Sequence, residues 1–341
     1  MKNSVNLKSK KNIVTTLTKL PFEPLVTGAY LSPETFMKGL AALLTLGITR
    51  RSNRFLNALA CNNWYLFPQA EWNWSEEIAV VTGGCSGIGK ALALSLSAKD
   101  IRVAALDIQD APEEFAHDSR ITFFRCDVSS AAAIADTAAA IQRKLGNPSI
   151  LINNAGISGG HTIFKTSPEY LDAIFKVNVL SHWHTVRALA PHMIGANKGH
   201  IVTLASVSSF ITNSANADYT ATKCASLAFH EGLTQELKVW YKCPGVVTSV
   251  VHPSFVRTPM IEGDVLRSGQ GEATLEGMLR PEEVAERILQ QILSGRGAQI
   301  IIPEAVSPVS WVKGLPNWAQ EGLRDLFGGM TAKYSGSVIE K

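Results

Sequence analysis

The sequence has no long uninterrupted apolar run, few cysteines and few charged residues. Charged residues make up 18% of the 341 positions and hydrophobic residues 46%, which favours a sizeable buried core. The cysteines are Cys61, Cys85, Cys126, Cys224 and Cys243. Their number is odd and no Cys-x-x-Cys pair occurs, so we expect free thiols in a reducing compartment. Without such pairs or a His-Glu-x-x-His pattern, we expect no metal site.

The first 70 residues carry most of the charge imbalance. They hold nine Lys or Arg against two Glu, a net charge of +7, whereas the whole chain carries +3 and the remainder therefore −4. A basic extension on a mildly acidic body favours an anionic membrane surface over nucleic acid as a partner, and a solvated basic tail explains the charge about as well. The polar start contains no apolar stretch of signal-peptide type.

An apolar helix is expected after a Ser-Pro-Glu start at residues 32–34. The segment from Phe36 to Ile48 is mostly apolar, and Gly47 with the Arg50-Arg51 pair predicts its end, giving a helix of roughly 16 residues. Because a membrane span needs about 20 apolar residues, a spanning helix is not expected. A helix in the membrane interface, one half of a hairpin with residues 55–67, and a helix packed on the body all remain open.

From Glu77 onward, short apolar runs alternate with helical segments. Ile78–Val81 has the pattern of a buried parallel strand, and a glycine-rich turn and a helix follow it. The alternation predicts an α/β fold, a Rossmann-type doubly wound parallel sheet of about six or seven strands in a single domain. We expect an N-terminal extension over residues 1–75, a main domain with this sheet over 76–303, and a C-terminal segment over 304–341.

The first strand leads into the sequence TGGCSGIG at residues 82–89. Glycines in such a loop allow a tight turn and bring backbone N–H groups close to a pyrophosphate at a helix start. Asp107 ends the second strand, where a carboxylate can bind the ribose hydroxyls of a dinucleotide and would repel a 2′-phosphate. NAD is therefore expected as cofactor, in preference to NADP. The loop residues expected to contact it are Gly83, Ser86, Gly87, Ile88 and Gly89.

Four later residues have the chemistry of a dehydrogenase. Tyr219 and Lys223 lie four apart, on one face of an expected helix. Because a tyrosine normally titrates near ~10, a neighbouring ammonium should lower the pKa of Tyr219 and make it a usable acid/base. Ser206, at a strand end, can hold the substrate oxygen, and Asn178 can hold a water that links Lys223 towards solvent. These four are the expected catalytic residues.

Together these motifs resemble the short-chain dehydrogenase/reductase superfamily over about residues 76–303. Three further motifs carry the resemblance: Asp127-Val128, the Asn-Asn-Ala-Gly run at 153–156, and residues 252–258, where Ser254 replaces the family's usual glycine. The resemblance implies that Asp127 faces the adenine, that Asn154 lines the cofactor cleft and that Val256 and Thr258 contact the nicotinamide end. It also places Val128, Ala155, Gly156, Tyr219 and Lys223 at the cofactor.

Two segments, 178–183 and 199–206, are similar to the membrane-associated branch that holds retinol dehydrogenases and 17β-hydroxysteroid dehydrogenases. That similarity implies a small lipophilic alcohol or ketone as substrate, and attachment to the cytoplasmic side of the endoplasmic reticulum or a lipid droplet through residues 1–70. A tailoring enzyme of a natural-product pathway, a non-catalytic cofactor-binding scaffold and a homodimer remain open. Residues 258–280 are expected to cap the pocket.

Overall fold

The computed structural model describes residues 32–261 and 277–334 and divides the chain into two units, residues 1–55 and 56–341. Most of the segment expected to cap the pocket, residues 262–276, lies outside the described residues, as do residues 1–31 with five of the nine basic residues of the extension. In the described chain, no helix is both long enough and apolar enough to cross a bilayer.

The apolar helix near the N-terminus is longer than the sequence predicts. Helix α2 runs from Pro33 to Cys61, 29 residues, so the expected stop at Gly47 and Arg50-Arg51 and the hairpin alternative are both wrong. A glycine inside a helix costs only about 1 kcal/mol and arginine is a good helix former, so neither needs to end it. The helix ends where Asn63 and Trp64 take positive φ angles and Trp64 N–H donates to the Leu59 carbonyl.

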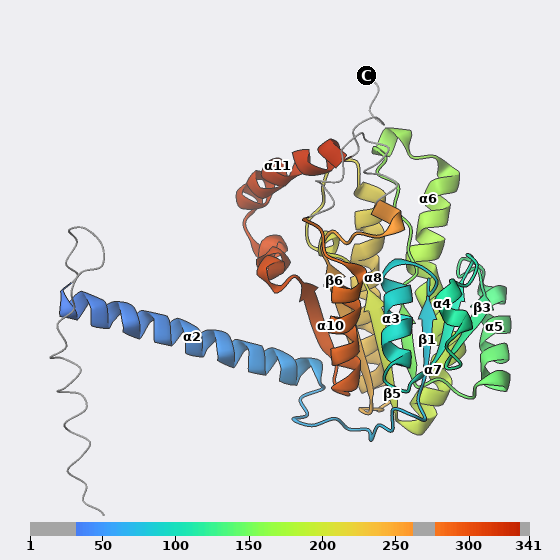
Figure 1. Ribbon diagram of the computed structural model, residues 1–341. Coiled ribbons are helices and arrows are strands. Elements are labelled where there is room, and N and C mark those ends of the chain that lie inside the picture. The colour runs from blue at the N-terminus through green and yellow to red at the C-terminus, as the bar shows by residue number, and fades with distance from the viewer. Residues whose placement is uncertain (1–31, 262–276, 335–341) are drawn as a thin grey trace, which may run out of the picture. The chain divides into compact units, whose positions relative to one another are not determined.

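The expected doubly wound sheet is confirmed, with seven strands, all parallel, in the order β3-β2-β1-β4-β5-β6-β7 (Figure 1). The strands are β1 (Ile78–Thr82), β2 (Arg102–Asp107), β3 (Ile121–Arg125), β4 (Ile150–Asn153), β5 (Gly199–Leu204), β6 (Val246–Pro253) and β7 (Ala298–Ile302). Strands β2 and β3 are added on one side of β1, and the strands from β4 onward are added on its other side, so the strand order reverses between β1 and β4. A ligand site is expected outside the carboxyl ends of the strands at such a switch point.

Helices cover both faces of the sheet and bury two apolar cores. On one face, α3 (Gly87–Ser97) and α10 (Pro281–Leu293) pack against every second strand residue, such as Val81 and Val251. The other face is covered by α5 (Ala131–Lys144), α7 (Ser181–Ala196) and α8 (Ala217–Val239). Burial on both faces explains why β1, β4, β5 and β6 have no exposed position and consist of apolar or small residues apart from Asn153, His200 and His252.

The remaining elements connect these layers. They are α4 (Glu113–Ala116), α6 (Pro168–Phe175), the short helical turns η2 (Ile163–Lys165), η3 (Lys176–Leu180) and η4 (Val207–Ser209), and, after the last strand, η6 (Glu304–Gly314) and α11 (Asn317–Tyr334). The sequence predicts a C-terminal segment after the last strand but not its helices. Ser167 and Arg280 precede prolines at two helix starts, as expected from their Pro-Glu patterns.

Candidate active site

A glycine-rich loop joins β1 to α3 at the switch point of the sheet. Gly87 has a φ of +51°, and a Cβ on Gly89 would lie 2.0 Å from the Gly83 carbonyl oxygen, so a side chain fits at neither position. Ser86 is the N-cap of α3 but makes no side-chain cap hydrogen bond. The first N–H groups of α3 therefore lack a side-chain cap, which suits the binding of a phosphate.

Asp107 lies beside this loop at the end of β2. It is buried, and its two carboxylate oxygens accept hydrogen bonds from Cys85 N–H at 2.9 Å and Gln109 N–H at 3.0 Å. Asp107 thus fixes the loop, and each oxygen keeps acceptor capacity for a ribose hydroxyl. Arg125, opposite Asp107 on β3, is a cation that the sequence analysis overlooked; its guanidinium donates to the Ile108 carbonyl and to Asp110.

The turn after β4 is tied to the glycine loop by Thr82 and Asn154. The Thr82 hydroxyl accepts from the N–H groups of Asn154 and Ala155, both at 3.0 Å, and Asn154 Nδ2 donates to the carbonyls of Thr82 (2.8 Å) and Gly83 (3.1 Å). Asn154 therefore builds the cleft wall more than it offers a free amide to a ligand. Thr82 was not singled out from the sequence, because a threonine at a strand end is common.

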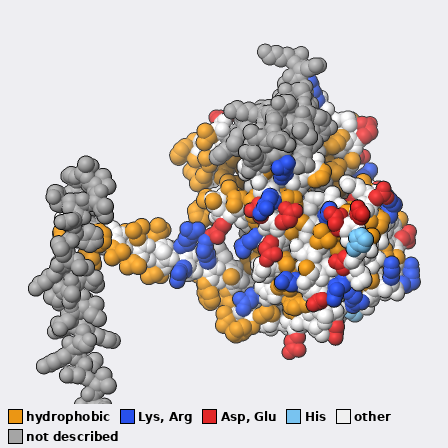
Figure 2. All heavy atoms as spheres, in the orientation of Figure 1, with side chains coloured by type: hydrophobic (Ala, Val, Ile, Leu, Met, Phe, Trp, Pro, Cys, Tyr) orange, Lys and Arg blue, Asp and Glu red, His pale blue; other side chains and the backbone are white. Residues whose placement is uncertain are grey.

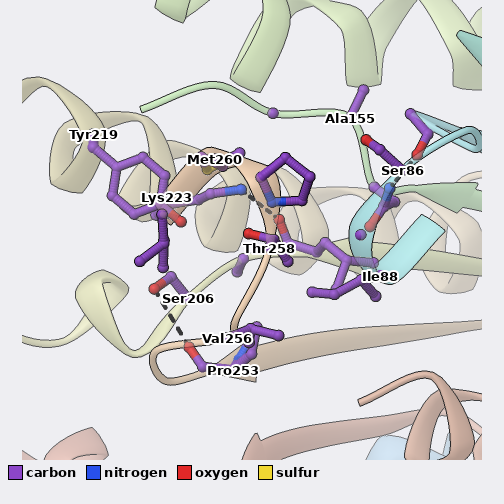
Figure 3. Close-up of a pocket in the computed structure, with 18 of the residues that line it drawn as sticks. Ser86, Ile88, Ala155, Ser206, Tyr219, Lys223, Pro253, Val256, Thr258 and Met260 are labelled. Carbon is purple, nitrogen blue, oxygen red and sulfur yellow. Dashed lines mark hydrogen bonds between the residues drawn. The ribbon is translucent and has the colours of Figure 1, made fainter. Parts of the chain in front are cut away.

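Ser206, Tyr219 and Lys223 converge on one side of a cavity, with Ser86, Ile88 and Ala155 on the other (Figure 3). Ser206 follows β5, and its hydroxyl donates to the Pro253 carbonyl at 3.5 Å. Lys223 is buried and its Nζ donates to the Leu204 carbonyl at 2.8 Å. The same Nζ lies 5.5 Å from the centre of the Tyr219 ring.

The ionisation of this pair differs from the sequence-based expectation. Burial raises the pKa of Tyr219 above its usual 10, and a side-chain hydrogen bond with Ser206 offsets this in part. Burial also lowers the pKa of Lys223 to about 8. Desolvation of the Tyr219 ring thus sets the direction of its pKa shift in the protein alone, and the phenol is protonated at neutral pH.

Asn178 lies apart from the cavity lining, in the turn η3, where the helical chain from α6 to α7 widens to π-helical hydrogen bonding. Its side chain clamps the loop after β4: Oδ1 accepts from Ile157 N–H at 2.8 Å, and Nδ2 donates to the Ile157 carbonyl at 2.9 Å and to Thr222 Oγ1 at 3.1 Å. Thr222 precedes Lys223, so Asn178 connects the loop after β4 to the helix that carries Tyr219 and Lys223.

Most of the expected site residues line one cavity of about 160 Å³. They are Gly83, Ser86, Gly87, Ile88, Asn154, Ala155, Gly156, Ser206, Tyr219, Lys223, Val256 and Thr258. Gly89, Asp107, Asp127, Val128 and Asn178 do not line it. The lining also includes Met260 and Ile261, two apolar residues that the sequence analysis placed only within the expected cap. Ser254 takes the place of the usual glycine without a positive φ.

Comparisons with known proteins agree with this geometry. A family model described as short chain dehydrogenase matches residues 77–266. Short-chain dehydrogenase/reductase family 16C member 6 of Bos taurus is 32% identical over 237 residues, which cover 67% of this chain and 73% of the bovine one. Estradiol 17-beta-dehydrogenase 11 of Rattus norvegicus is 32% identical (71% and 80% covered), and retinol dehydrogenase 10-B of Danio rerio 29% identical (75% and 82%).

A solved structure supports the same assignment. A short chain dehydrogenase/reductase from Burkholderia phymatum, determined in complex with NAD, is 25% identical and superposes with a TM-score of 0.63. The match covers 72% of this chain and 95% of the bacterial one.

Proposed function

The chain belongs to the short-chain dehydrogenase family and is an oxidoreductase of alcohol and carbonyl groups, and on that premise we propose that Ser206, Tyr219 and Lys223 catalyse the interconversion of a lipophilic alcohol and its aldehyde or ketone. The observation that carries the proposal is that these three side chains line the same cavity as the glycine loop. A nicotinamide cofactor, when bound there, accepts or supplies the hydride.

Each residue has a role that follows from its surroundings. Tyr219, protonated at neutral pH, can donate its proton to a carbonyl oxygen during reduction. In the oxidative direction it must first lose that proton, and the charge of Lys223 stabilises the phenolate. Ser206 turns its hydroxyl from Pro253 to the substrate oxygen, at the cost of one long hydrogen bond. We assign Asn178 a supporting role, because its amide is occupied by Ile157 and Thr222.

NAD is the cofactor that we propose. The N-terminus of α3 can take the pyrophosphate, and the buried Asp107 carboxylate can accept from ribose hydroxyls and would repel a 2′-phosphate. Arg125, opposite Asp107 on β3, is already bonded to Asp110. A 2′-phosphate on the ribose would have to compete with the Asp110 carboxylate for the Arg125 guanidinium.

A lipophilic substrate is supported by apolar residues of the cavity lining and by the relatives. Val256, Met260 and Ile261 give the cavity apolar walls, and the names of the relatives include retinol and estradiol. A natural-product intermediate would fit the same walls. The scaffold alternative is disfavoured, because a protein that only binds the cofactor has no need of Ser206, Tyr219 and Lys223 together.

We also propose peripheral contact with an anionic membrane. No residue of α2 is buried, and Figure 2 shows hydrophobic side chains along this helix with basic ones towards its later half. In the other unit, the buried Asn62 donates to the carbonyls of Tyr65 and Phe67 and fixes a loop whose side chains from Trp64 to Phe67 are 42–66% exposed. Exposed aromatic and basic side chains together suit a bilayer interface.

The decisive experiment is a substrate screen. Purified protein is incubated with NAD and a panel containing a retinoid, a steroid, a long-chain fatty alcohol and a short alcohol, and NADH absorbance is followed. Oxidation of at least one lipophilic alcohol, in preference to the short one, is expected. Tight NADH binding without turnover of any member, in either direction, would favour the scaffold instead.

A further inference from the structure

Ser206 is held from two sides by consecutive residues of the neighbouring strand. His252 Nδ1 lies 2.9 Å from the Ser206 backbone carbonyl oxygen, and the next residue, Pro253, accepts the Ser206 hydroxyl at 3.5 Å. Both residues belong to the carboxyl end of β6, which pairs with β5 up to Leu204. The backbone and the hydroxyl of Ser206 are thus both hydrogen-bonded to β6.

The hydrogen bonds fix the tautomer of the His252 ring. A carbonyl oxygen only accepts, so Nδ1 carries the proton and donates to Ser206. The other ring nitrogen, Nε2, is then an acceptor, and Gln299 Nε2 on β7 lies 3.4 Å from it. A chain of hydrogen bonds therefore runs from Gln299 through His252 to Ser206.

The ring has no freedom to leave this position. His252 is fully buried, and the ring of Phe210 lies against it with the centroids 4.6 Å apart. Burial lowers the pKa of His252 to about 4, and the nearby charge of Lys223 acts in the same direction. The imidazole is consequently neutral near pH 7, as its role of donor on one side and acceptor on the other demands.

We propose that His252 is a positioning residue for Ser206: it anchors the serine backbone so that the hydroxyl faces the reacting oxygen in the pocket. The Ser206 carbonyl also accepts from Ser209 N–H at 2.9 Å. If the His252 donor is lost, this carbonyl therefore still accepts a hydrogen bond. The loss should change the direction in which the carbonyl points and leave it buried. This inference rests on the proposed function, because it assigns a purpose to the placement of Ser206.

The test compares three full-length variants with the wild type on the best alcohol of the panel. His252→Leu removes the donor, whereas His252→Asn returns an amide nitrogen the same number of bonds from the backbone as Nδ1. His200→Leu is the matched control, because His200 is likewise buried in the sheet and bonded to a serine, Ser249, at 2.8 Å. We expect kcat of His252→Leu to fall about ten- to a hundredfold, with the NADH dissociation constant unchanged. His252→Asn should recover most of the loss, and His200→Leu should keep its kcat.

Unchanged kcat in His252→Leu, or no recovery in His252→Asn, would overturn the proposal while leaving the dehydrogenase assignment intact. If His252→Leu does not fold, Gln299→Met replaces it, since Gln299 is exposed and loses only the support of the ring. The kcat of Gln299→Met should fall about three- to tenfold, the equivalent of one hydrogen bond. An unchanged kcat would refute the hydrogen-bond chain from Gln299 through His252 to Ser206.

If no alcohol is turned over, the proposed function fails. Nitrogen NMR of 15N-histidine protein still tests the hydrogen-bond chain, because the chain requires a proton on Nδ1 of His252 and a proton on Nε2 contradicts it.

Discussion

Lys223 and Tyr219 lie one helical turn apart on α8, with the ammonium nitrogen of the lysine 5.5 Å from the centre of the tyrosine ring. The same nitrogen is anchored to the Leu204 carbonyl on β5. Helix α8 therefore delivers both groups to the end of the sheet, next to Ser206.

Replacing Tyr219 with Phe should remove turnover and leave cofactor binding in place. The phenolic oxygen is the proposed proton path, and general acid–base catalysis contributes about 10²–10⁴-fold. We expect kcat to fall by at least about 10²-fold, with NADH affinity unchanged by fluorescence titration. Tyr241→Phe is the matched control, because Tyr241 is exposed just beyond the other end of α8. A Tyr219→Phe enzyme with more than about a tenth of wild-type kcat would refute the assignment.

Alanine substitutions at two glycines should have different effects, because a Cβ has no room at one of them and open space at the other. At Gly89 the added Cβ would meet the Gly83 carbonyl oxygen at 2.0 Å and the Asn154 amide at 2.5 Å, so the cofactor loop must shift. At Gly232, inside α8, nothing lies within 4 Å and alanine is favoured by about 1 kcal/mol. Gly89→Ala should weaken NADH binding strongly and Gly232→Ala should raise the free energy of unfolding without changing binding. Equal NADH affinities of the two variants would contradict the loop geometry.

The sequence predicts the sheet and the pocket more completely than it predicts ionisation and helix ends. The glycine loop and the residues that we propose to be catalytic could be assigned to one site from the sequence, because their spacing follows the parallel strands to one edge. The length of α2 could not, since a single glycine and two arginines give no decisive stop. The pKa direction of Tyr219 depends on how deeply the ring is buried, which only the packing of α8 reveals. The hydrogen bond from His252 to Ser206 joins residues 46 positions apart, and no local sequence pattern indicates it.

Stability should fall in mild acid because four histidines, three of them buried and His230 half-buried, are held in neutral form. Burial lowers the pKa of each, to about 3 for His182 and His200 and about 4 for His230 and His252. Between these values and the unfolded pKa near 6.5, the unfolded state binds more protons, so stability is complete above that pH and is lost as pH falls towards 3. The loss is up to about 1.4 kcal/mol per histidine per pH unit.

His182→Leu should make the protein less sensitive to acid. Neither ring nitrogen of His182 has a hydrogen-bond partner within the described chain, so the substitution removes a titrating group without breaking a bond. Urea unfolding at pH 7 and pH 5 measures the effect. The variant should lose less free energy than the wild type between the two, and an equal loss would show that His182 does not titrate on unfolding.

Membrane contact should require residues 1–55, the first of the two units. The second unit begins at Leu56, and its first residues pack on the rest of that unit, because Cβ atoms added to Gly297 and Gly295 would meet Cys61 and Trp72. A chain shortened to start at Leu56 should therefore stay folded and float poorly with phosphatidylserine-containing vesicles, whereas the full chain floats and is released by carbonate. Replacing Arg50, Arg51 and Arg54 with Gln should weaken flotation by about 1 kcal/mol per charge. Equal flotation of full and shortened chains would show that residues 1–55 are not needed for membrane contact.

Cofactor choice should depend on Asp107. Two unit charges about 4 Å apart near a protein surface interact by roughly 4 kcal/mol at an effective dielectric of about 20, and rearrangement reduces that. A preference for NAD over NADP of about 10- to 100-fold in kcat/KM is therefore expected, since about 1.4 kcal/mol corresponds to a factor of ten. The measurement is steady-state kinetics with both cofactors, and a wild type that prefers NADP would contradict the role of Asp107.

The double variant Asp107→Ser, Ile108→Arg should reverse the preference. It removes the repelling carboxylate and adds a guanidinium for the phosphate, and Ile108 is 63% exposed, so an arginine fits there. Because Asp107 also binds the N–H groups of Cys85 and Gln109, part of the activity with either cofactor should be lost. Asp107→Asn separates the effects: it keeps one acceptor for the loop and removes the charge, so it should lower the preference for NAD without creating one for NADP. An unchanged preference in the double variant would mean that another group, with Arg125 the first candidate, reads the ribose.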